Sequence, residues 1–580
     1  MPWTYAGETL SQPGVIAAID NTGISTPANT NTRELVLVGS AGGGQPKTVL
    51  TFTDPATAQN VLQSGTGLTA VLRALNPSDD PTVSPGIVKF VRIDPATQSS
   101  YNVVNGATTV IQLESVGYGS YTDRITTQIT AGSIQGLKAN VTLDNTSLTQ
   151  DNLYQAAFSV QYTGSQASGL VTVSNASGYI EGLAGPAGTE TVQWTANFST
   201  YTTIQQVINY INSQTGWTAS LISANPNGPS ANALDDASSQ ACKATAYTVT
   251  AILQAVINFY NGTNLVTATR PNSVGLLPST MTAPAYLTGG TNGTPTNTDW
   301  SDAFLALQNE GLARIIVPLT DQSTIHAMGD SHCAYMSQPN IRKNRVQFAG
   351  GLAGETVSQV LTRAQNLNSR RTTLVWPGIQ DVDPITFQLT TYAPYYVAAQ
   401  AAAIFSSLPI VQALTRQSLK CKGLEGTLQS TLQSSDYDNL VNGGVCAIQF
   451  QQNSLGNAYR FVRSVTTWLQ DTNLVNVEIS CVANEDYVSI AVGDTVDALI
   501  GTPGTPVGVG RVMSAIDGTL RSLYEEGAVV GDKISDAYGN IVVKLNQGAV
   551  TSTYNATIPA PINFAGLTTK FSLYSTTKAA

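Results

Sequence analysis

The sequence predicts a multidomain protein of mixed α/β and α+β class, in which an inserted, mainly β module interrupts an α/β core. The length of 580 residues is the first observation, because it gives material for several domains. The second is the pattern along the chain: strand and helix signals alternate on both sides of a middle region of short alternating strands among Ser, Gly and Asn turns. The third is the Pro- and Thr-rich composition of both ends, which indicates extended arms.

These observations divide the chain into five regions. We predict an N-terminal arm over 1–30, a discontinuous α/β domain over 31–125 and 286–407, the β module over 126–285, a C-terminal α+β domain over 408–551 and a C-terminal arm over 552–580. The first arm has one apolar patch, "GVIAAID" from Gly14. The second ends in an alternation of apolar and polar residues, "KFSLYS" from Lys570, and a free strand of this kind is an aggregation hazard unless a partner pairs with it.

The predicted α/β domain starts with a strand, a helix and a second strand. The first strand is "ELVLVG" from Glu34, and the second is "GIVKFVRID" from Gly86, which is rich in β-branched and aromatic residues. Between them, the segment from Asp54 to Pro77 has apolar residues largely at helical spacing: Val61, Leu62, Leu68, Val71, Leu72 and Leu75. Together the three elements predict a βαβ-like unit.

The rest of the chain continues these patterns. The β module contains strands such as "FSVQYTG" and "GLVTVSN" and one amphipathic helix, "TIQQVINYINSQ". The α/β domain resumes with a helix "DWSDAFLALQNEG", a strand "ARIIVPL", a helix "GETVSQVLTRAQNLN" and a strand "TTLVWPG". The C-terminal region contains "VRSVTTW", "LVNVEIS", a helix "VGRVMSAIDGTLRSLYEEG", and strands "IVVKLN" and "KFSLY".

Charged residues make up 11% of the chain, against about 25% in ordinary soluble domains. Neighbouring subunits can cover a surface with few ions at a low desolvation cost, which suits a protein that works in an assembly. The formal net charge of −10 disfavours attraction to a polyphosphate backbone, so we expect no direct nucleic acid partner. We see no signal peptide and no apolar stretch long enough to span a bilayer, and we expect the protein in the cytosol. The five cysteines lack C-x-x-C spacing and are expected to be free and mostly buried.

A glycine-rich loop follows the first strand, in "ELVLVGSAGGGQPKT". A nucleotide-binding P-loop needs a lysine directly after its last glycine, so that the ammonium and the backbone N–H groups converge on one phosphate. Here Gln45 and Pro46 separate Gly44 from Lys47, and Pro46 lacks an N–H group. The glycines also do not form a G-x-G-x-x-G motif. We therefore interpret the loop as a structural turn.

We predict no catalytic, cofactor-binding or metal-binding residues. His326 and His332 are six positions apart and lie on different sides of a helix. With the adjacent Cys333 they are therefore expected to pack in the ordinary way or to be exposed to solvent, and not to form a metal or Cys/His site. The acidic pairs lack the spacing of a calcium loop and are interpreted as turns: Asp79/Asp80, Asp235/Asp236 and Asp381/Asp383. A G-x-S-x-G nucleophile elbow is absent, and its nearest echo lacks the closing glycine: Gly228, Pro229 and Ser230.

The densest positive segment is "IRKNRVQFAGG", which contains Arg342, Lys343 and Arg345. Such a segment could bind an acidic surface of a partner. Short runs of charge are more often solvated, and we favour a solvated turn.

Several segments, read in order, resemble the contractile tail sheath proteins of bacteriophages. "LVLVGSAGGGQP" is similar to the family's first strand and glycine turn, "IVKFVRI" to its next strand, and "LESVGYGSYTDRITTQI" to a small-residue turn before a strand. The most specific is "YLTGGTNGTPTNTDWSDAFLALQ", where a Gly-Gly turn and a further Gly precede a helix that opens on an acidic-aromatic pair. "AAQAAAIFSSLPIVQALT", "VRSVTTW" and "ANEDYV" resemble the C-terminal signature of the family. The similar segments span nearly the whole chain and keep the family's order.

This resemblance implies a structural virion protein, not an enzyme, with no cofactor. Subunits of such sheaths form hexameric rings stacked in a helix around a rigid tail tube, and a baseplate trigger lets them slide into a shorter, wider lattice that drives the tube through the host envelope. The implied partners are copies of the chain, the tail tube protein, and the baseplate and tail terminator proteins, with no direct contact to nucleic acid or membrane. Assembly would occur in the host cytoplasm and place the protein in the virion tail. The region 408–551 would face the tube and form the assembly core, and both arms would join sheets on neighbouring subunits.

Two features depart from the family pattern. Gln400 stands where relatives often have Gly, and the β module is of the variable kind, so the resemblance implies no role for it. An alternative is a tail fibre or decoration protein that binds surface carbohydrate, which the Ser/Thr/Asn-rich module favours, and a third possibility is an enzyme of the envelope. A negative-stain image separates the three: tubes or rings indicate a sheath, elongated trimers a fibre and compact monomers an enzyme.

Overall fold

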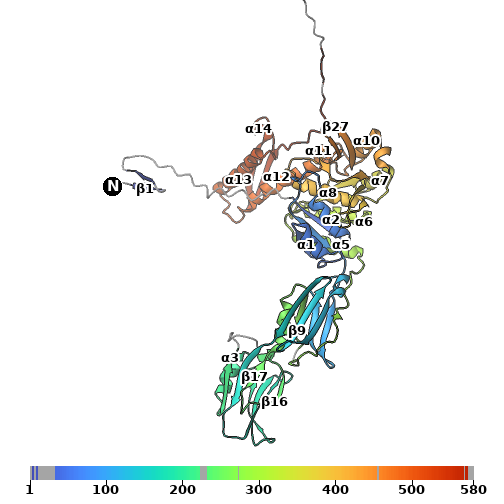
Figure 1. Ribbon diagram of the computed structural model, residues 1–580. Coiled ribbons are helices and arrows are strands. Elements are labelled where there is room, and N and C mark those ends of the chain that lie inside the picture. Colours follow the sequence, from blue (N-terminus) through green and yellow to red (C-terminus); the bar gives the residue numbers. More distant parts are fainter. Residues whose placement is uncertain are drawn as a thin grey trace, which may run out of the picture. The chain divides into compact units, whose positions relative to one another are not determined.

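The computed structural model describes residues 3–5, 8–10, 33–222, 231–271, 274–453, 456–566 and 568–571. The chain divides into two compact units. The first consists of Met1–Leu37, Arg73–Lys89 and Gln308–Ala580, and the second of Val38–Leu72 and Phe90–Leu307. Both contain helices and sheets, so the protein is a mixed α/β chain with several sheets, as predicted (Figure 1).

A largely parallel sheet lies at the core of the first unit. Its strands follow the order β25-β28-β27-β22-β21-β20-β3-β5. Their bounds are Ser418–Leu419 for β25, Gly456–Phe461 for β28, Val445–Asn453 for β27, Thr372–Trp376 for β22, Val346–Gly350 for β21, Ala313–Pro318 for β20, Glu34–Gly39 for β3 and Val88–Arg92 for β5. From β20 to β27 the neighbours are parallel, with Gln347 opposite Thr372 and Leu374 opposite Val445. The predicted strands "ELVLVG", "ARIIVPL" and "TTLVWPG" are therefore confirmed.

Helices cover this parallel sheet on both faces. On one face lies α8 (Pro394–Ser407), whose Phe405 ring is centred 5.6 Å from the ring of Phe348 in β21. Ala349, the next residue of β21, points to the opposite face and packs there with α7 (Val357–Leu367) and α10 (Ser434–Asn442). The apolar stretch "YYVAAQAAAIF" is thus a core helix, and among the described residues no helix is long and apolar enough to cross a membrane.

Helix α6 (Ser323–Met336) carries both histidines into the core of the first unit. His326 is fully buried, and its Nε2 atom lies 2.8 Å from the carbonyl oxygen of Thr320. His332 is also buried, with its Nε2 atom 2.7 Å from Nη1 of Arg345. Burial lowers the pKa of both imidazoles to about 4, and the Arg345 guanidinium adds to the effect on the pKa of His332. Both side chains are therefore neutral at pH 7.

The C-terminal part of the first unit consists of two long helices and a hairpin (orange to red in Figure 1). The elements are α11 (Leu474–Val477), α12 (Ile479–Asp497), α13 (Pro506–Glu525), α14 (Ile534–Ala537), β29 (Tyr538–Asn546) and β30 (Ala549–Ala556). Val492, Ile516 and Tyr538 belong to one buried cluster that joins α12, α13 and the hairpin. The predicted helix and the strand "IVVKLN" are confirmed, whereas "LVNVEIS" forms α11 and the start of α12.

The predicted C-terminal arm begins inside this hairpin, because the boundary at 552 falls within β30. The described residues Lys570 and Phe571 are not in a strand, and the rest of "KFSLYS" lies outside the described residues, as does the patch "GVIAAID". Near the N-terminus, β1 (Trp3–Tyr5) and β2 (Glu8–Leu10) pair antiparallel. The two arms as interaction segments stay a prediction.

The second unit opens with β4 (Val49–Phe52) and two helices, where one helix was predicted. The helices are α1 (Pro55–Leu62) and α2 (Gly65–Leu75). Gln63 has a φ of 62°, so the helical path ends there although the apolar spacing continues beyond it. The single-helix prediction is therefore wrong, because the spacing of apolar residues does not reveal a residue with a positive φ.

Two buried clusters make up the β region of the second unit. The first joins the sheets β18-β7-β6 and β10-β9-β8-β19 to α4. Its elements are β6 (Ser100–Asn105), β7 (Thr108–Ser115), β8 (Thr126–Ala131), β9 (Leu137–Leu143), β10 (Thr146–Leu153), α4 (Ile252–Asn261), β18 (Val266–Thr269) and β19 (Ala285–Tyr286). Strands β6 and β7 precede residue 126, yet β7 pairs with β18, so they share the core of the segment predicted as a module.

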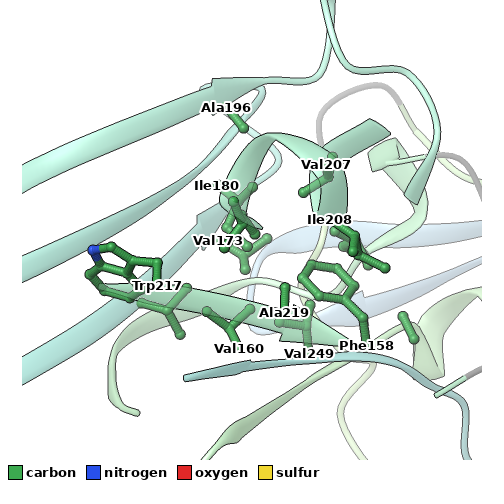
Figure 2. Packing of buried hydrophobic residues seen from close by; sticks show 14 of the residues in the cluster. Phe158, Val160, Val173, Ile180, Ala196, Val207, Ile208, Trp217, Ala219 and Val249 are labelled. Atoms are coloured by element: carbon green, nitrogen blue, oxygen red, sulfur yellow. The ribbon is translucent and has the colours of Figure 1, made fainter. Parts of the chain in front are cut away.

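The second cluster joins the sheets β15-β11-β17 and β14-β13-β12-β16 to α3. Its elements are β11 (Ala156–Tyr162), β12 (Ser168–Ser174), β13 (Tyr179–Gly185), β14 (Thr191–Asn197), α3 (Ile204–Asn212), β15 (Trp217–Leu221), β16 (Ala237–Ala241) and β17 (Tyr247–Thr250). Figure 2 shows Val207 and Ile208 of α3 over the strand side chains Ile180, Phe158 and Val249. The prediction of one helix in the segment 126–285 is wrong, because α4 is a second helix there, in addition to α3.

Two glycines lie inside helices, and they differ in the space around them. Gly67 of α2 leaves no room for a methyl group, since an added Cβ atom would lie 2.4 Å from Cζ of Phe90, whereas Gly518 of α13 has nothing within 4 Å. We expect Gly518→Ala to stabilise the protein by about 1 kcal/mol and Gly67→Ala to destabilise it by about 1–3 kcal/mol. Urea unfolding of both variants checks this, and stabilisation by both would contradict the packing described for α2.

The buried histidines predict a loss of stability in mild acid. Their pKa values are about 4 in the folded protein and about 6.5 in an unfolded chain. The unfolded state therefore binds more protons between these values, and each histidine lowers the free energy of unfolding by up to about 1.4 kcal/mol per pH unit as the pH falls from 6.5 towards 4. His326→Asn should flatten this decline between pH 6.5 and 5, as measured by urea midpoints. An unchanged slope would mean that His326 is not buried in neutral form.

Candidate functional site

The glycine-rich loop after β3 is packed against the end of α1. The N–H group of Gly42 donates a 2.8 Å hydrogen bond to the carbonyl oxygen of Ser64. A methyl group on Gly43 would lie 2.3 Å from the carbonyl oxygen of Val61, so a larger residue does not fit. The glycines thus allow two backbone segments to approach closely.

Arg92 lies beside the glycine-rich loop and binds its last glycine. Its guanidinium is fully buried and donates to the carbonyl oxygens of Gly44 and Tyr118, both at 2.9 Å. It also donates to Oδ1 of Asn292 at 3.1 Å and to Oδ2 of Asp94 at 3.0 Å. The carbonyl oxygen of Gly44 therefore points at a cation, which is the opposite of the polarity that a phosphate nest requires. Arg92 instead forms hydrogen bonds to three loops of the second unit, those that contain Gly44, Tyr118 and Asn292.

The lysine of the loop binds two carboxylates. The Nζ atom of Lys47 lies 2.6 Å from Oδ2 of Asp302 and 3.1 Å from Oδ1 of Asp299, both in α5 (Asn297–Ala306). Hydrogen bonds to Asp302 and Asp299 raise the pKa of Lys47. This geometry agrees with the interpretation of the loop as a structural turn.

The histidines and cysteines do not form a common site. In the part of the chain that the structure describes, no group of three or more His, Cys, Asp or Glu side chains is placed to hold a metal ion. All five cysteines are buried and free, as expected. Burial raises the pKa of Cys242 and Cys481 to about 11 and that of Cys421 to about 12, so these thiols are protonated at neutral pH.

Asp235 is a buried helix cap. Its carboxylate accepts hydrogen bonds from the N–H groups of Ile252 at 2.6 Å and Leu253 at 3.1 Å, at the start of α4. Burial raises the pKa of Asp235, while these hydrogen bonds and that of Thr250 act in the opposite direction. The interpretation as a turn is therefore wrong for Asp235, because its side chain is a distant cap for a helix.

Asp381 belongs to a second buried network. Nη2 of Arg73 lies 3.0 Å from Oδ2 of Asp381, and both side chains are buried. Gln400 completes the network: its Oε1 atom accepts from Arg73 Nε at 3.2 Å, and its Nε2 atom donates to the carbonyl oxygen of Lys420 at 3.2 Å. Gln400, which departs from the family pattern, therefore has a structural role in this network. The turn interpretation is wrong for Asp381 as well.

Asp80 and Asp383 are turn residues, as interpreted. Oδ1 of Asp80 accepts from the N–H group of Thr82 at 2.9 Å, and Oδ1 of Asp383 accepts from that of Ile385 at 2.9 Å. Both carboxylates hold their own loop.

The basic segment does not form one positive surface. Arg345 is buried, so the prediction of a solvated turn is wrong for this residue. Its guanidinium donates to the carbonyl oxygen of Glu310 and contacts His332. Arg342 pairs with Asp497 at 3.3 Å and also with Asp494, and Nζ of Lys343 donates to a backbone carbonyl oxygen. The three cations therefore serve the packing of their own unit.

The hairpin β29–β30 is the best candidate for an assembly site. The hairpin has only two strands, and within the described ranges no third strand pairs with either edge. One face packs on α13 through the cluster that contains Tyr538 and Val543. Val542 on the opposite face is exposed, and so are Leu545 and Val550, which pair next to the turn. Two free edges are features of a sheet that accepts a strand from another chain.

Arg33 anchors the start of the described core to the first unit. Its Nη2 atom donates to the carbonyl oxygens of Leu408 at 3.0 Å and Pro409 at 2.9 Å, and its guanidinium lies 4.0 Å from the ring centre of Phe405. Burial lowers the pKa of Arg33 to about 9, so the side chain is still charged at pH 7. Arg33 is therefore held at a fixed point of this unit.

Known proteins similar to this chain are tail sheath proteins. No protein-family model matches the chain. It is 26% identical over 582 residues to the tail sheath protein of Bacillus phage SP01, with 97% of this chain and 95% of the relative covered. It is 28% identical over 501 residues to a protein of Enterococcus phage phiEF24C named as a tail sheath protein, with 83% and 84% covered. The crystal structure of a sheath tail protein from Desulfitobacterium hafniense matches with a TM-score of 0.53 at 12% identity, over 92% of this chain and 93% of that one, which is a likeness of fold.

These relatives are structural proteins rather than enzymes, and the match to them covers most of the chain. Neither the glycine loop nor the histidines, cysteines and acidic pairs form a site that would suggest a different activity in the described part of the chain. The resemblance that the sequence indicated is confirmed: the chain is similar to phage tail sheath proteins over most of its length.

Proposed function

We propose that this chain is the subunit of a contractile tail sheath. It polymerises as stacked hexameric rings around the tail tube and contracts to drive the tube through the host cell envelope during genome delivery. The observation that carries this proposal is the match to the tail sheath protein of Bacillus phage SP01 over 97% of this chain and 95% of that protein. The charged content of 11% supports it, because subunit surfaces poor in ions are covered at a low desolvation cost.

The proposed partners are copies of the chain, the tail tube protein, and the baseplate and tail terminator proteins. Assembly occurs in the host cytoplasm, and the product is part of the virion tail, with no direct contact to nucleic acid or membrane. Within the subunit, the region 408–551 faces the tube, and the β module is peripheral. These assignments follow the family and the composition of each region.

The terminal segments supply the links between subunits in this proposal. An open helical assembly uses heterologous contacts, in which one patch binds a different patch on the next copy. Subunits that slide without separating need a link that survives the motion, and backbone pairing at a sheet edge provides one because it depends little on side chains. The free edges of β29 and β30 are suited to receive such strands from the arms of neighbouring copies.

Negative-stain microscopy of the purified full chain tests this function. We expect tubes or stacked rings that form in a concentration-dependent manner. Elongated trimers would favour the tail fibre or decoration protein instead, and strictly monomeric protein under all conditions would contradict the proposal.

The β module should be dispensable for assembly if it is removed at its own boundary. Thr97 and Thr291 pair in a β-bridge, and the N–H group of Thr97 donates to the carbonyl oxygen of Thr291 at 2.9 Å. We expect a chain in which a short Gly-Ser linker replaces 98–290 to stay soluble and form tubes. Deleting only 126–285 should cause aggregation, because Val110 and Ile111 of β7 would lose their buried partners. A soluble but permanently monomeric 98–290 deletion would show that the module belongs to the assembly core.

A further inference from the structure

A fully buried carboxylate lies where α11 meets α12. Glu478 has no exposed surface, and both of its oxygens accept hydrogen bonds. Oε1 lies 2.6 Å from Nε of Arg463, and Oε2 accepts from the hydroxyl of Ser464 at 3.0 Å. These two donors belong to the segment "VRSVTTW" and hold the carboxylate in one orientation.

A third donor to Glu478 comes from the C-terminal segment, 85 residues further along the chain. Nδ2 of Asn563 donates to Oε1 of Glu478 at 2.8 Å, and Oδ1 of Asn563 accepts from the hydroxyl of Thr415 at 3.3 Å. Both ends of the Asn563 amide are therefore bound to the body of the first unit. A hydrogen bond to a buried charged group is among the stronger ones in a protein.

The residues around Asn563 have a different character. They form no helix or strand, and the side chains on either side of Asn563 are large, apolar and mostly exposed. Ile562 is 89% exposed, and Phe564 is 85% exposed although the guanidinium of Arg463 lies 5.8 Å from its ring centre. Exposure of these two large apolar side chains to water costs free energy in an isolated subunit. The exposure is relieved if another surface covers them.

We propose that Glu478 is the anchor of the C-terminal segment. Its carboxylate holds Asn563 on its own subunit, so that the residues beyond Asn563 leave from a fixed point, and Ile562 and Phe564 are covered by a second copy of this chain. The partner in this proposal rests on the proposed sheath function, because a second copy is the surface that a polymer places beside every subunit. Anchoring also lowers the entropy lost on binding, since the root of the segment is already ordered.

The anchor can be tested in the full chain with a nitroxide at Ala565→Cys. Labelling is selective because all five native cysteines are buried. We expect a restricted label in the otherwise unchanged chain and a mobile label after Asn563→Ala or Asn563→Asp, the latter because it places a second carboxylate against Glu478. Ala560→Asp, which adds the same charge at an exposed position of this segment, is the control and should leave the label restricted.

An exchange of the two groups tests the pair directly. In Asn563→Asp with Glu478→Gln, the amide donates in the opposite direction, and the new carboxylate can pair with Arg463. We expect Asn563→Asp to raise the critical concentration for polymerisation at least about tenfold, equivalent to about 1.4 kcal/mol, and the exchange to restore both the restricted label and assembly. Circular dichroism and melting confirm that each variant is folded.

Three results would overturn the proposal: a label that stays restricted in both Asn563 variants, a folded double variant that restores neither property, or a freed label with an unchanged critical concentration. If the unaltered chain forms no polymer, the sheath function and the second copy as partner both fail. The label comparison then still decides whether Glu478 anchors the segment. Asn563→Ala keeps the test valid if Glu478→Gln impairs folding, because it leaves the buried carboxylate in place.

Discussion

Burial of the parallel sheet on both faces is the constraint on which the first unit depends. Once α8 lies on one face and α7 and α10 on the other, polar groups that enter this core must find partners inside it. The Arg73, Asp381 and Gln400 network meets this requirement, as does the pairing of Arg345 with His332. Few of the charges near this core are therefore available for chemistry. They fix the relative positions of helices, strands and loops.

Buried charged side chains hold the start of the described core and the C-terminal segment in place. Arg33 ties the start of the described core to the carbonyl oxygens after α8, and Asn563 ties the C-terminal segment to Glu478. In the second unit, Arg92 plays a similar part by bridging three loops. In each case a buried charged side chain makes several hydrogen bonds with segments far apart in the sequence: Arg33 and Arg92 donate them, and Glu478 accepts them. In a structural subunit, such anchors fix the position of the segments that they hold.

The sequence predicted elements whose causes are local, and missed those whose causes are distant. Strands β3, β20 and β22 follow from continuous apolar runs, and α7 follows from its own Thr356 capping box. Helix α4 was missed because its cap is Asp235, which lies 17 residues upstream in the sequence and had been taken for a turn. The break between α1 and α2 depends on the positive φ of one residue, Gln63, which has no strong sequence signal. Likewise, Glu478 and Asn563 meet only in the folded chain, so spacing could not have paired them.

A helical reconstruction of the assembled polymer tests whether Glu478 anchors the C-terminal segment beside a second copy. We expect density that continues from Asn563, bound to Glu478 of its own subunit, to an edge of the β29–β30 hairpin of a second copy, with Ile562 and Phe564 covered at that contact. Density in which the C-terminal segment folds back onto the hairpin of its own subunit, or leaves Glu478 altogether, would contradict it.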